Sequence, residues 1–146
     1  MKKVLFWLWS LTWGGIMTIL GLIITGFCIL FLKGKVHKNG YSYIVEIGGN
    51  WGGLDLGAVA LCGGYTTTCK DENWFQHTRR HEFGHSLQNL IWGPLFPFVI
   101  AIPSAIRYNY QNWRSKKGLE NKDYDAIWFE GQATKWGTKA IEKIEK

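Results

Sequence analysis

Cysteine is scarce in this sequence, and blocks of like charge are absent. Three cysteines in 146 residues are too few for a disulfide scaffold. Cys62 and Cys69 are not spaced as Cys-x-x-Cys, so we do not expect them to bind a metal; they either pair in an oxidising compartment or remain thiols in the cytosol. The net charge of +6 comes from scattered basic residues without a nucleic-acid-binding motif. We therefore expect no nucleic-acid partner, and an anionic lipid surface fits this charge better.

Charged residues are also missing from Val4–Leu32, which is almost wholly apolar. A bilayer core needs about 20 apolar residues, so this run is long enough to span it. A cleaved signal peptide has a shorter apolar region of roughly 7–15 residues, which favours an uncleaved anchor. We predict a single-pass anchor over residues 1–33 and a second domain over residues 34–146. Lysines flank both ends of the run, so the orientation in the membrane stays open.

A His-Glu-x-x-His motif is present from His81 to His85, within a stretch that we expect to be one helix from Asn73 to Trp92. Residues four apart share a helix face, so the imidazoles of His81 and His85 can bind one metal ion. Glu82 follows His81 and lies about a quarter-turn around the helix, beside that metal. A carboxylate there can take a proton from a metal-bound water. The motif therefore predicts a Zn²⁺ site with Glu82 as the general base.

A catalytic zinc site usually has three protein ligands, so a third must come from elsewhere in the chain. Glu130 is our candidate, on a final helix predicted over Asp123–Lys146. Small residues share its helical face: Ala126, Ala133 and Gly137. Such a stripe lets two helices approach closely, which a carboxylate needs to reach a metal on the neighbouring helix. Asp123 and Asp125 are the alternatives, although capping of the helix start explains them more simply.

The remaining elements indicate an α+β fold. Tyr41–Ile47 and Leu54–Cys62 are expected to be two short strands that form a hairpin. Leu95–Ile106 is an apolar segment broken by Pro97 and Pro103; it is either an interface-dipping element or an ordinary part of the core. The predicted architecture is an N-terminal transmembrane helix followed by a short hairpin, the motif helix, this segment and a C-terminal ligand helix.

The motif together with Glu130-Gly131-Gln132-Ala133 resembles the zincin metallopeptidases of the gluzincin type. Those enzymes pair a His-Glu-x-x-His helix with a downstream Glu in a Glu-x-x-Ala-like setting. The resemblance implies a small zincin-like domain in which the two motif histidines and Glu130 bind zinc and Glu82 is the general base. The extended metzincin motif is absent, because Gln88 and Ile91 stand where it has Gly and His.

The expected function is that of a membrane-anchored zinc endopeptidase acting on membrane-associated proteins or peptides. The Leu54–Cys62 strand would align an extended substrate by backbone pairing. Three tyrosines are candidates for stabilising the oxyanion, and the sequence does not rank them: Tyr108, Tyr110 and Tyr124. The alternative is a membrane-anchored adaptor or pseudoenzyme with a structural or empty metal site, binding partners through Leu95–Ile106.

Overall fold

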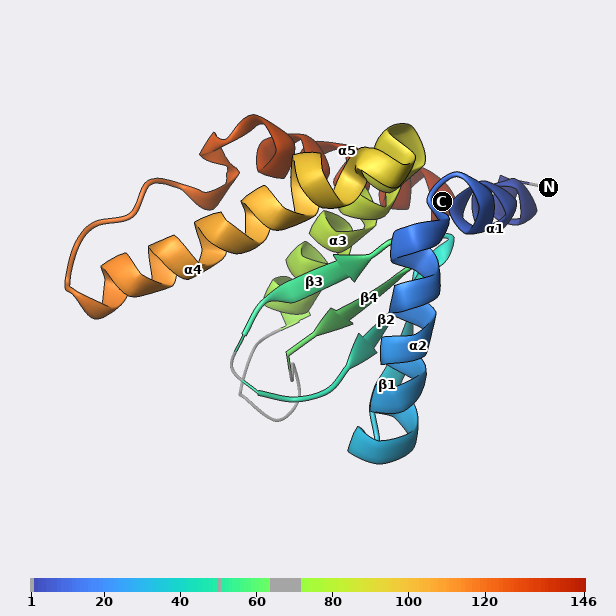
Figure 1. Cartoon of the computed structure of the whole chain (residues 1–146), viewed down its shortest axis with the longest axis horizontal. Coiled ribbons are helices and arrows are strands. Elements are labelled where there is room, and N and C mark those ends of the chain that lie inside the picture. Colours follow the sequence, from blue (N-terminus) through green and yellow to red (C-terminus); the bar gives the residue numbers. More distant parts are fainter. Residues whose placement is uncertain (1, 50, 64–71) are drawn as a thin grey trace.

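A small sheet with helices on both faces forms the centre of the computed structural model, which describes residues 2–49, 51–63 and 72–146 (Figure 1). The strands run in the order β1-β2-β4-β3. They are β1 Lys35–Asn39, β2 Ser42–Glu46, β3 Gly53–Leu56 and β4 Val59–Cys62. The α-helices are α1 Lys2–Thr12, α2 Gly15–Leu32, α3 Glu72–Trp92, α4 Ile102–Lys116 and α5 Trp128–Ile144. Three short helical turns complete the described elements: η1 Gly93–Leu95, η2 Pro97–Ala101 and η3 Tyr124–Ala126.

The two central strands, β2 and β4, are mostly buried, and successive side chains along them contact two different helices. Val45 of β2 packs with Cys28 of α2, whereas the preceding Ile44 packs with Phe75 of α3. Successive residues of a strand point to opposite faces, so α2 covers one face of the sheet and α3 covers the other. Because α3 carries the motif histidines, the sheet supports the candidate site from one side.

The predicted hairpin between Tyr41–Ile47 and Leu54–Cys62 is wrong. The second segment is itself a hairpin, because Gly57 adopts φ +82° and turns the chain between β3 and β4. β2 pairs with β4 in parallel, and it forms its antiparallel hairpin with β1, a strand that the sequence did not predict. β3 is consequently an edge strand of the sheet.

The apolar N-terminal run forms two helices that break at Gly14, where the side chain of Asn89 donates a hydrogen bond to the Gly14 carbonyl. Among the described residues, α2 is the one helix long and apolar enough to cross a membrane; the core helix of a soluble protein or a signal sequence passes the same test. Its sheet-facing side is mostly small or polar: Met17, Thr18, Gly21, Thr25 and Cys28. Its large apolar residues, such as Ile23 and Phe31, point outward and are exposed.

The motif helix extends over Glu72–Trp92, one residue longer than predicted. The Pro-broken segment is also helical, and its axis is bent by 117° from that of α3. Pro97 and Pro103 stand at the first or second residue of η2 and α4, where a missing N–H costs no intrahelical bond. The prolines therefore start new helices rather than interrupt one.

The predicted start of the final helix at Asp123 is wrong. The extended backbone of Ile127 separates η3 from α5, which begins at Trp128. Asp123 caps η3, because its side chain accepts a hydrogen bond from the backbone N–H of Asp125. Ala126 consequently lies outside α5, and Ala133 and Gly137 remain as small residues on its buried face.

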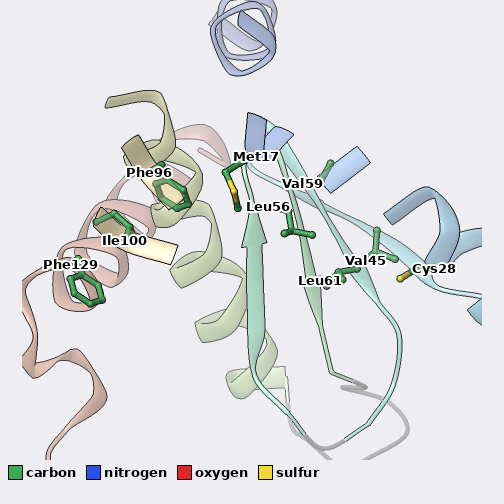
Figure 2. Close-up of a cluster of buried hydrophobic side chains, with 9 residues drawn as sticks. All are labelled: Met17, Cys28, Val45, Leu56, Val59, Leu61, Phe96, Ile100 and Phe129. Atoms are coloured by element: carbon green, nitrogen blue, oxygen red, sulfur yellow. The ribbon is translucent and has the colours of Figure 1, made fainter. Parts of the chain in front are cut away.

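One buried apolar cluster reaches from α2 and the sheet to the bend after α3 (Figure 2). Met17, Cys28 and strand residues such as Leu61 fill the space between α2 and the sheet. Three helix residues form the other end of the same cluster: Phe96, Ile100 and Phe129. These three residues pack the bend after α3 against α5. Cys69 lies outside the described residues, so both alternatives for Cys62 and Cys69, a disulfide or two thiols, stay open.

Candidate metal centre

The motif helix and the final helix pack in direct backbone contact. A Cβ atom added at Gly84 would overlap the carbonyl oxygen of Ala133, and one added at Gly137 would overlap the carbonyl oxygen of Arg80. Glycine at these two positions therefore permits an approach that any side chain would prevent. The close approach brings Glu130 in the first turn of α5 against the two motif histidines.

Three donor atoms converge between the helices. The Nε2 atoms of His81 and His85 lie 3.1 Å apart, and Oε2 of Glu130 lies 3.1 Å from each of them. A tetrahedral zinc site with bonds of about 2.0–2.1 Å holds its donor atoms about 3.3 Å apart. All three side chains are buried, and Glu130 has no exposed surface. The spacing therefore fits a metal ion shared by the three residues.

The rings of both histidines are oriented by second hydrogen bonds. Nδ1 of His85 lies 2.7 Å from Oε1 of Gln88, and Nδ1 of His81 lies 2.7 Å from Oγ1 of Thr134. The Gln88 amide donates to the carbonyl oxygen of Phe129, so its own oxygen is left to accept from His85. His85 therefore donates through Nδ1 and directs the lone pair of Nε2 toward the other donors.

The pKa values of the three donor residues depend on their burial and on their charges, which lie close to one another. Burial lowers the pKa of His81. Burial also acts to lower the pKa of His85, but the hydrogen bond and negative charge of Glu130 raise it to about 9. Burial acts to raise the pKa of Glu130, yet the bonds from both histidines hold it below its ordinary value. In the absence of a metal, one proton on His85 thus balances the Glu130 carboxylate, and a cation would replace that proton.

A polar atom without a partner supports a cation at this place. Oε1 of Glu130 is buried and accepts no hydrogen bond within the described part of the chain. A buried carboxylate oxygen without a donor is costly unless a cation or water satisfies it. The donor set of two imidazoles and one carboxylate is also the set found in one class of catalytic zinc sites. His81, His85 and Glu130 can therefore hold a metal ion.

Glu82 is held between the motif helix and the edge strand β3. Its carboxyl group lies directly over Gly53, where an added Cβ would overlap Oε1. Burial raises the pKa of Glu82 to about 8, while a hydrogen bond from the backbone of Asp55 lowers it. Glu82 lines the same cavity as the two histidines. A carboxyl group with a raised pKa beside the donor cluster is suited to accept and return a proton.

Asp55 is a residue of the site region that the sequence analysis missed. Its Oδ1 accepts a hydrogen bond from Ser86 at 2.7 Å and its Oδ2 accepts one from the Gly57 backbone at 3.0 Å. Burial raises its pKa to about 7. Asp55 thereby links β3 to Ser86, the residue that follows His85. A lone Asp within an apolar strand was the available signal, since an unpaired carboxylate is rarely buried.

The donor cluster opens into a cavity of about 470 Å³ between β3 and the start of α4. The Tyr124 ring lies 6.0 Å from that of His81, and its hydroxyl lies 3.1 Å from Oγ of Ser104. Burial raises the pKa of Tyr124, so the hydroxyl stays protonated. Tyr108 also lines the cavity, whereas Tyr110 stacks against Trp113 on an exposed face. Of the three tyrosines, Tyr124 lies most directly beside the histidines.

The structure brings together the four residues that the sequence singled out: His81, Glu82, His85 and Glu130. The alternatives for the third donor do not join the cluster, because Asp123 caps η3 through the Asp125 backbone. His77 is exposed one turn before His81 and lines the cavity without joining the three donors. The sequence did not predict that Thr134 and Gln88 orient the histidine rings, because this role depends on the packing of α5 against α3.

No protein-family model, curated protein or solved structure matches this chain. The resemblance to gluzincins therefore rests on residues of two helices, α3 and α5.

The Gln88 side chain offers a test of the metal centre away from the donor atoms. Gln88→Leu should weaken zinc binding by about 10- to 100-fold, because the His85 ring loses the bond that orients it. Competition with a chromogenic chelator measures this affinity. Gln76→Leu makes the same change three turns earlier on α3, where the amide bonds Glu72 and Arg79, and should leave the affinity unchanged. Equal affinities in the two variants would contradict the assigned role of Gln88.

Proposed function

We propose that the chain is a zinc-dependent endopeptidase associated with a membrane. The observation that carries the proposal is the convergence of three donor atoms at 3.1 Å, with Glu82 beside them in one cavity. Two neutral imidazoles and one carboxylate would suit Zn²⁺, and the cavity lined by His81 and His85 would give a water access to it. A purely structural zinc site would use four protein ligands.

The chemistry divides between the metal and the protein. A bound Zn²⁺ supplies positive charge that acidifies water, polarises a carbonyl group and lowers the pKa of nearby carboxyls. Glu82 takes the proton of the attacking water on its carboxylate and delivers it to the leaving nitrogen of the scissile amide. Gly53, directly opposite Glu82, lets the carboxyl group lie against β3. The strand thereby restricts the orientation of the base.

The edge strand and Tyr124 supply the other groups that amide hydrolysis needs. β3 borders the cavity through Gly53 and Leu54, and its outer edge pairs with no other strand of the described residues, so it can pair with an extended polypeptide. The protonated Tyr124 hydroxyl, held by Ser104, donates a hydrogen bond to the oxyanion that forms from the substrate carbonyl. The apolar side chains of Phe96 and Ile100 line the same cavity and receive an apolar substrate side chain.

The outward face of α2 supports association with a membrane. Large apolar residues such as Ile19, Ile23 and Leu30 point away from the sheet, while small and polar residues face it. Soluble helices show the opposite arrangement, and helices in lipid pack through small residues. We accordingly place α2 in contact with lipid.

The proposal predicts a metal requirement that depends on Glu130. Glu130→Ala should lower the bound zinc from one equivalent per chain to near zero, because two imidazoles alone bind zinc weakly. Elemental analysis of the purified protein measures this. Glu120→Ala makes the same change in the loop after α4 and should keep the metal, because Glu120 is exposed. Unchanged zinc in the Glu130 variant would move the third donor elsewhere.

Cleavage of an unfolded polypeptide such as casein tests the activity itself. Removal of zinc with a chelator should stop cleavage, and added zinc should restore it. A zinc-loaded protein that cleaves no unfolded polypeptide would contradict the proposed hydrolysis.

A second candidate is favoured by the direct bonds among the donor residues. Glu130 binds both histidines at 3.1 Å and so links α3 to α5 without any metal. In that case the chain would be an adaptor or pseudoenzyme whose buried ion pairs serve the fold. Zinc-free protein with unaltered thermal stability after chelation would favour the adaptor.

A further inference from the structure

Helix α4 lines one side of the metal cavity and has two different faces. Its inner side lines the cavity with small and polar residues, among them Ser104 and Ala105, together with Tyr108. All 15 residues of α4 are described, and none of them is buried. Isolated helices of this length are marginal in water, and most helical stability comes from packing of an apolar face. Figure 1 shows α4 projecting away from the sheet, with the following loop folded back along it.

The outer side of the η2–α4 segment is an exposed apolar stripe. Phe98, Ile102 and Ile106 follow one another at intervals of four and are 68%, 49% and 64% exposed. Tyr110 and Trp113 extend the stripe and are 55% and 52% exposed. Residues three and four apart share a helix face, so these five side chains form one surface. Contiguous exposed apolar surfaces of this kind mark contact with lipid or with protein.

Positive charge borders the stripe and favours lipid as the occupant. Arg107 and Arg114 lie beside it and donate to neutral backbone carbonyls of Asp123 and Glu120, so these bonds do not cancel their charge. Lys116 and Lys117 follow at the end of the helix and are exposed. Apolar residues with Trp on one face and cations at its border are typical of helices that lie in the plane of an anionic bilayer surface.

Exposed apolar residues also lie where the motif helix meets the N-terminal segment. Ile91 and Leu95, which precede the stripe in the chain, are each 57% exposed. There Trp9 and Trp13 donate indole hydrogen bonds to the carbonyls of Leu90 and Ile91 and remain about half exposed, at 56% and 47%. Indole rings favour the membrane interface. Residues suited to a membrane interface are thus present both on α4 and on the segment that leads into α2.

We propose that the outer face of α4 docks on an anionic lipid bilayer, with the helix in the plane of the interface. Docking places the mouth of the metal cavity at the bilayer surface, because the inner face of the same helix walls that cavity. On the proposed hydrolytic function, the substrates are polypeptide segments that emerge from the bilayer, and an apolar side chain occupies the pocket beside Phe96 and Ile100.

Photo-crosslinking tests the docking without reference to catalysis. The full chain carries p-benzoylphenylalanine in place of Ile106 or, as the matched control, in place of Ser115 on the opposite side of α4. It is reconstituted in vesicles of phosphatidylcholine with and without phosphatidylglycerol. The proposal expects lipid adducts at position 106, few at position 115, and more adducts when the anionic lipid is present. A crosslink between two copies of the chain, or equal lipid adducts at both positions, would overturn it.

A comparison of two substrates tests the consequence for the cleavage reaction. The triple variant Phe98→Ser, Ile102→Ser, Ile106→Ser removes the stripe and changes no residue that lines the cavity. It should cleave a soluble peptide at the rate of the unaltered chain. Its cleavage of the same peptide linked to a lipid in the vesicles should fall by about 100-fold, because α2 still holds the chain on the vesicle but the mouth of the cavity no longer lies at the bilayer surface, where the peptide is.

The outcomes separate docking from hydrolysis. Equal loss on both peptides, or no loss on either, would overturn the role of the stripe in substrate delivery. Should the unaltered zinc-loaded chain cleave neither peptide while position 106 still crosslinks to lipid, the proposed hydrolysis fails and the docking of α4 stands.

Discussion

Glu82→Gln should abolish peptide hydrolysis while the protein keeps its zinc. Glutamine has the size of glutamate but does not accept the proton of the attacking water, and a positioned general base contributes about 10²- to 10⁴-fold to the rate. The three donor atoms belong to other residues, so the metal content should stay at one equivalent. Cleavage of an unfolded polypeptide and elemental analysis of the same sample measure both quantities.

Glu142→Gln is the matched control for this result. Glu142 lies on α5 like the donor Glu130, but its side chain is exposed. The control should cleave at the rate of the unaltered chain. Activity that survives in the Glu82 variant would show that another group takes the proton, and zinc lost from it would assign Glu82 to the metal instead.

Gly137→Ala should separate the motif helix from the final helix. The added methyl group would overlap the carbonyl oxygen of Arg80, which belongs to the backbone and moves only with the whole helix. Overpacking of this kind lowers the free energy of unfolding by about 1–3 kcal/mol, with larger losses where backbone must shift. Glu130 would move away from the histidines with its helix. We expect a lower thermal midpoint and weaker zinc binding in the same variant.

Gly26→Ala provides the control for Gly137→Ala. A Cβ atom at Gly26 meets no described atom within 4 Å, and the residue lies inside α2. Alanine in a helix interior is favoured over glycine by about 1 kcal/mol, so this variant should be as stable as the unaltered chain or more stable. Thermal unfolding followed by far-UV circular dichroism compares the two. A Gly137 variant that unfolds like the control would contradict the backbone contact between α3 and α5.

The features that the sequence predicted correctly depend on short-range spacing. His81 and His85 share a face in any α-helix, so their meeting required only that α3 be helical. Glu130 was found because small residues recur beside it on the same face, and Ala133 does contact α3 at Gly84. Each pattern lies within a single helix, so it does not depend on how the rest of the chain folds.

The features that the sequence missed depend on contacts between distant segments. Nothing local in Leu54–Cys62 distinguishes one strand from a tight hairpin except Gly57, whose positive φ became evident only in the structure. The parallel pairing of β2 with β4 likewise follows from packing against α2 and α3 on the two faces. Gln88 and Thr134 acquire their roles only once α5 lies against the motif helix.

The contacts between the N-terminal segment and the motif helix have a consequence for processing of the chain. Trp9 and Trp13 donate to carbonyls at the carboxyl end of the motif helix, and Asn89 of that helix donates to the carbonyl of Gly14. In addition, α2 shields the apolar residues of β4. Removal of the leading helices by a processing protease would leave those helix-end carbonyls without their donors and open one face of the sheet to water. On the proposed function, shedding from a membrane would therefore inactivate this molecule rather than release it in working form.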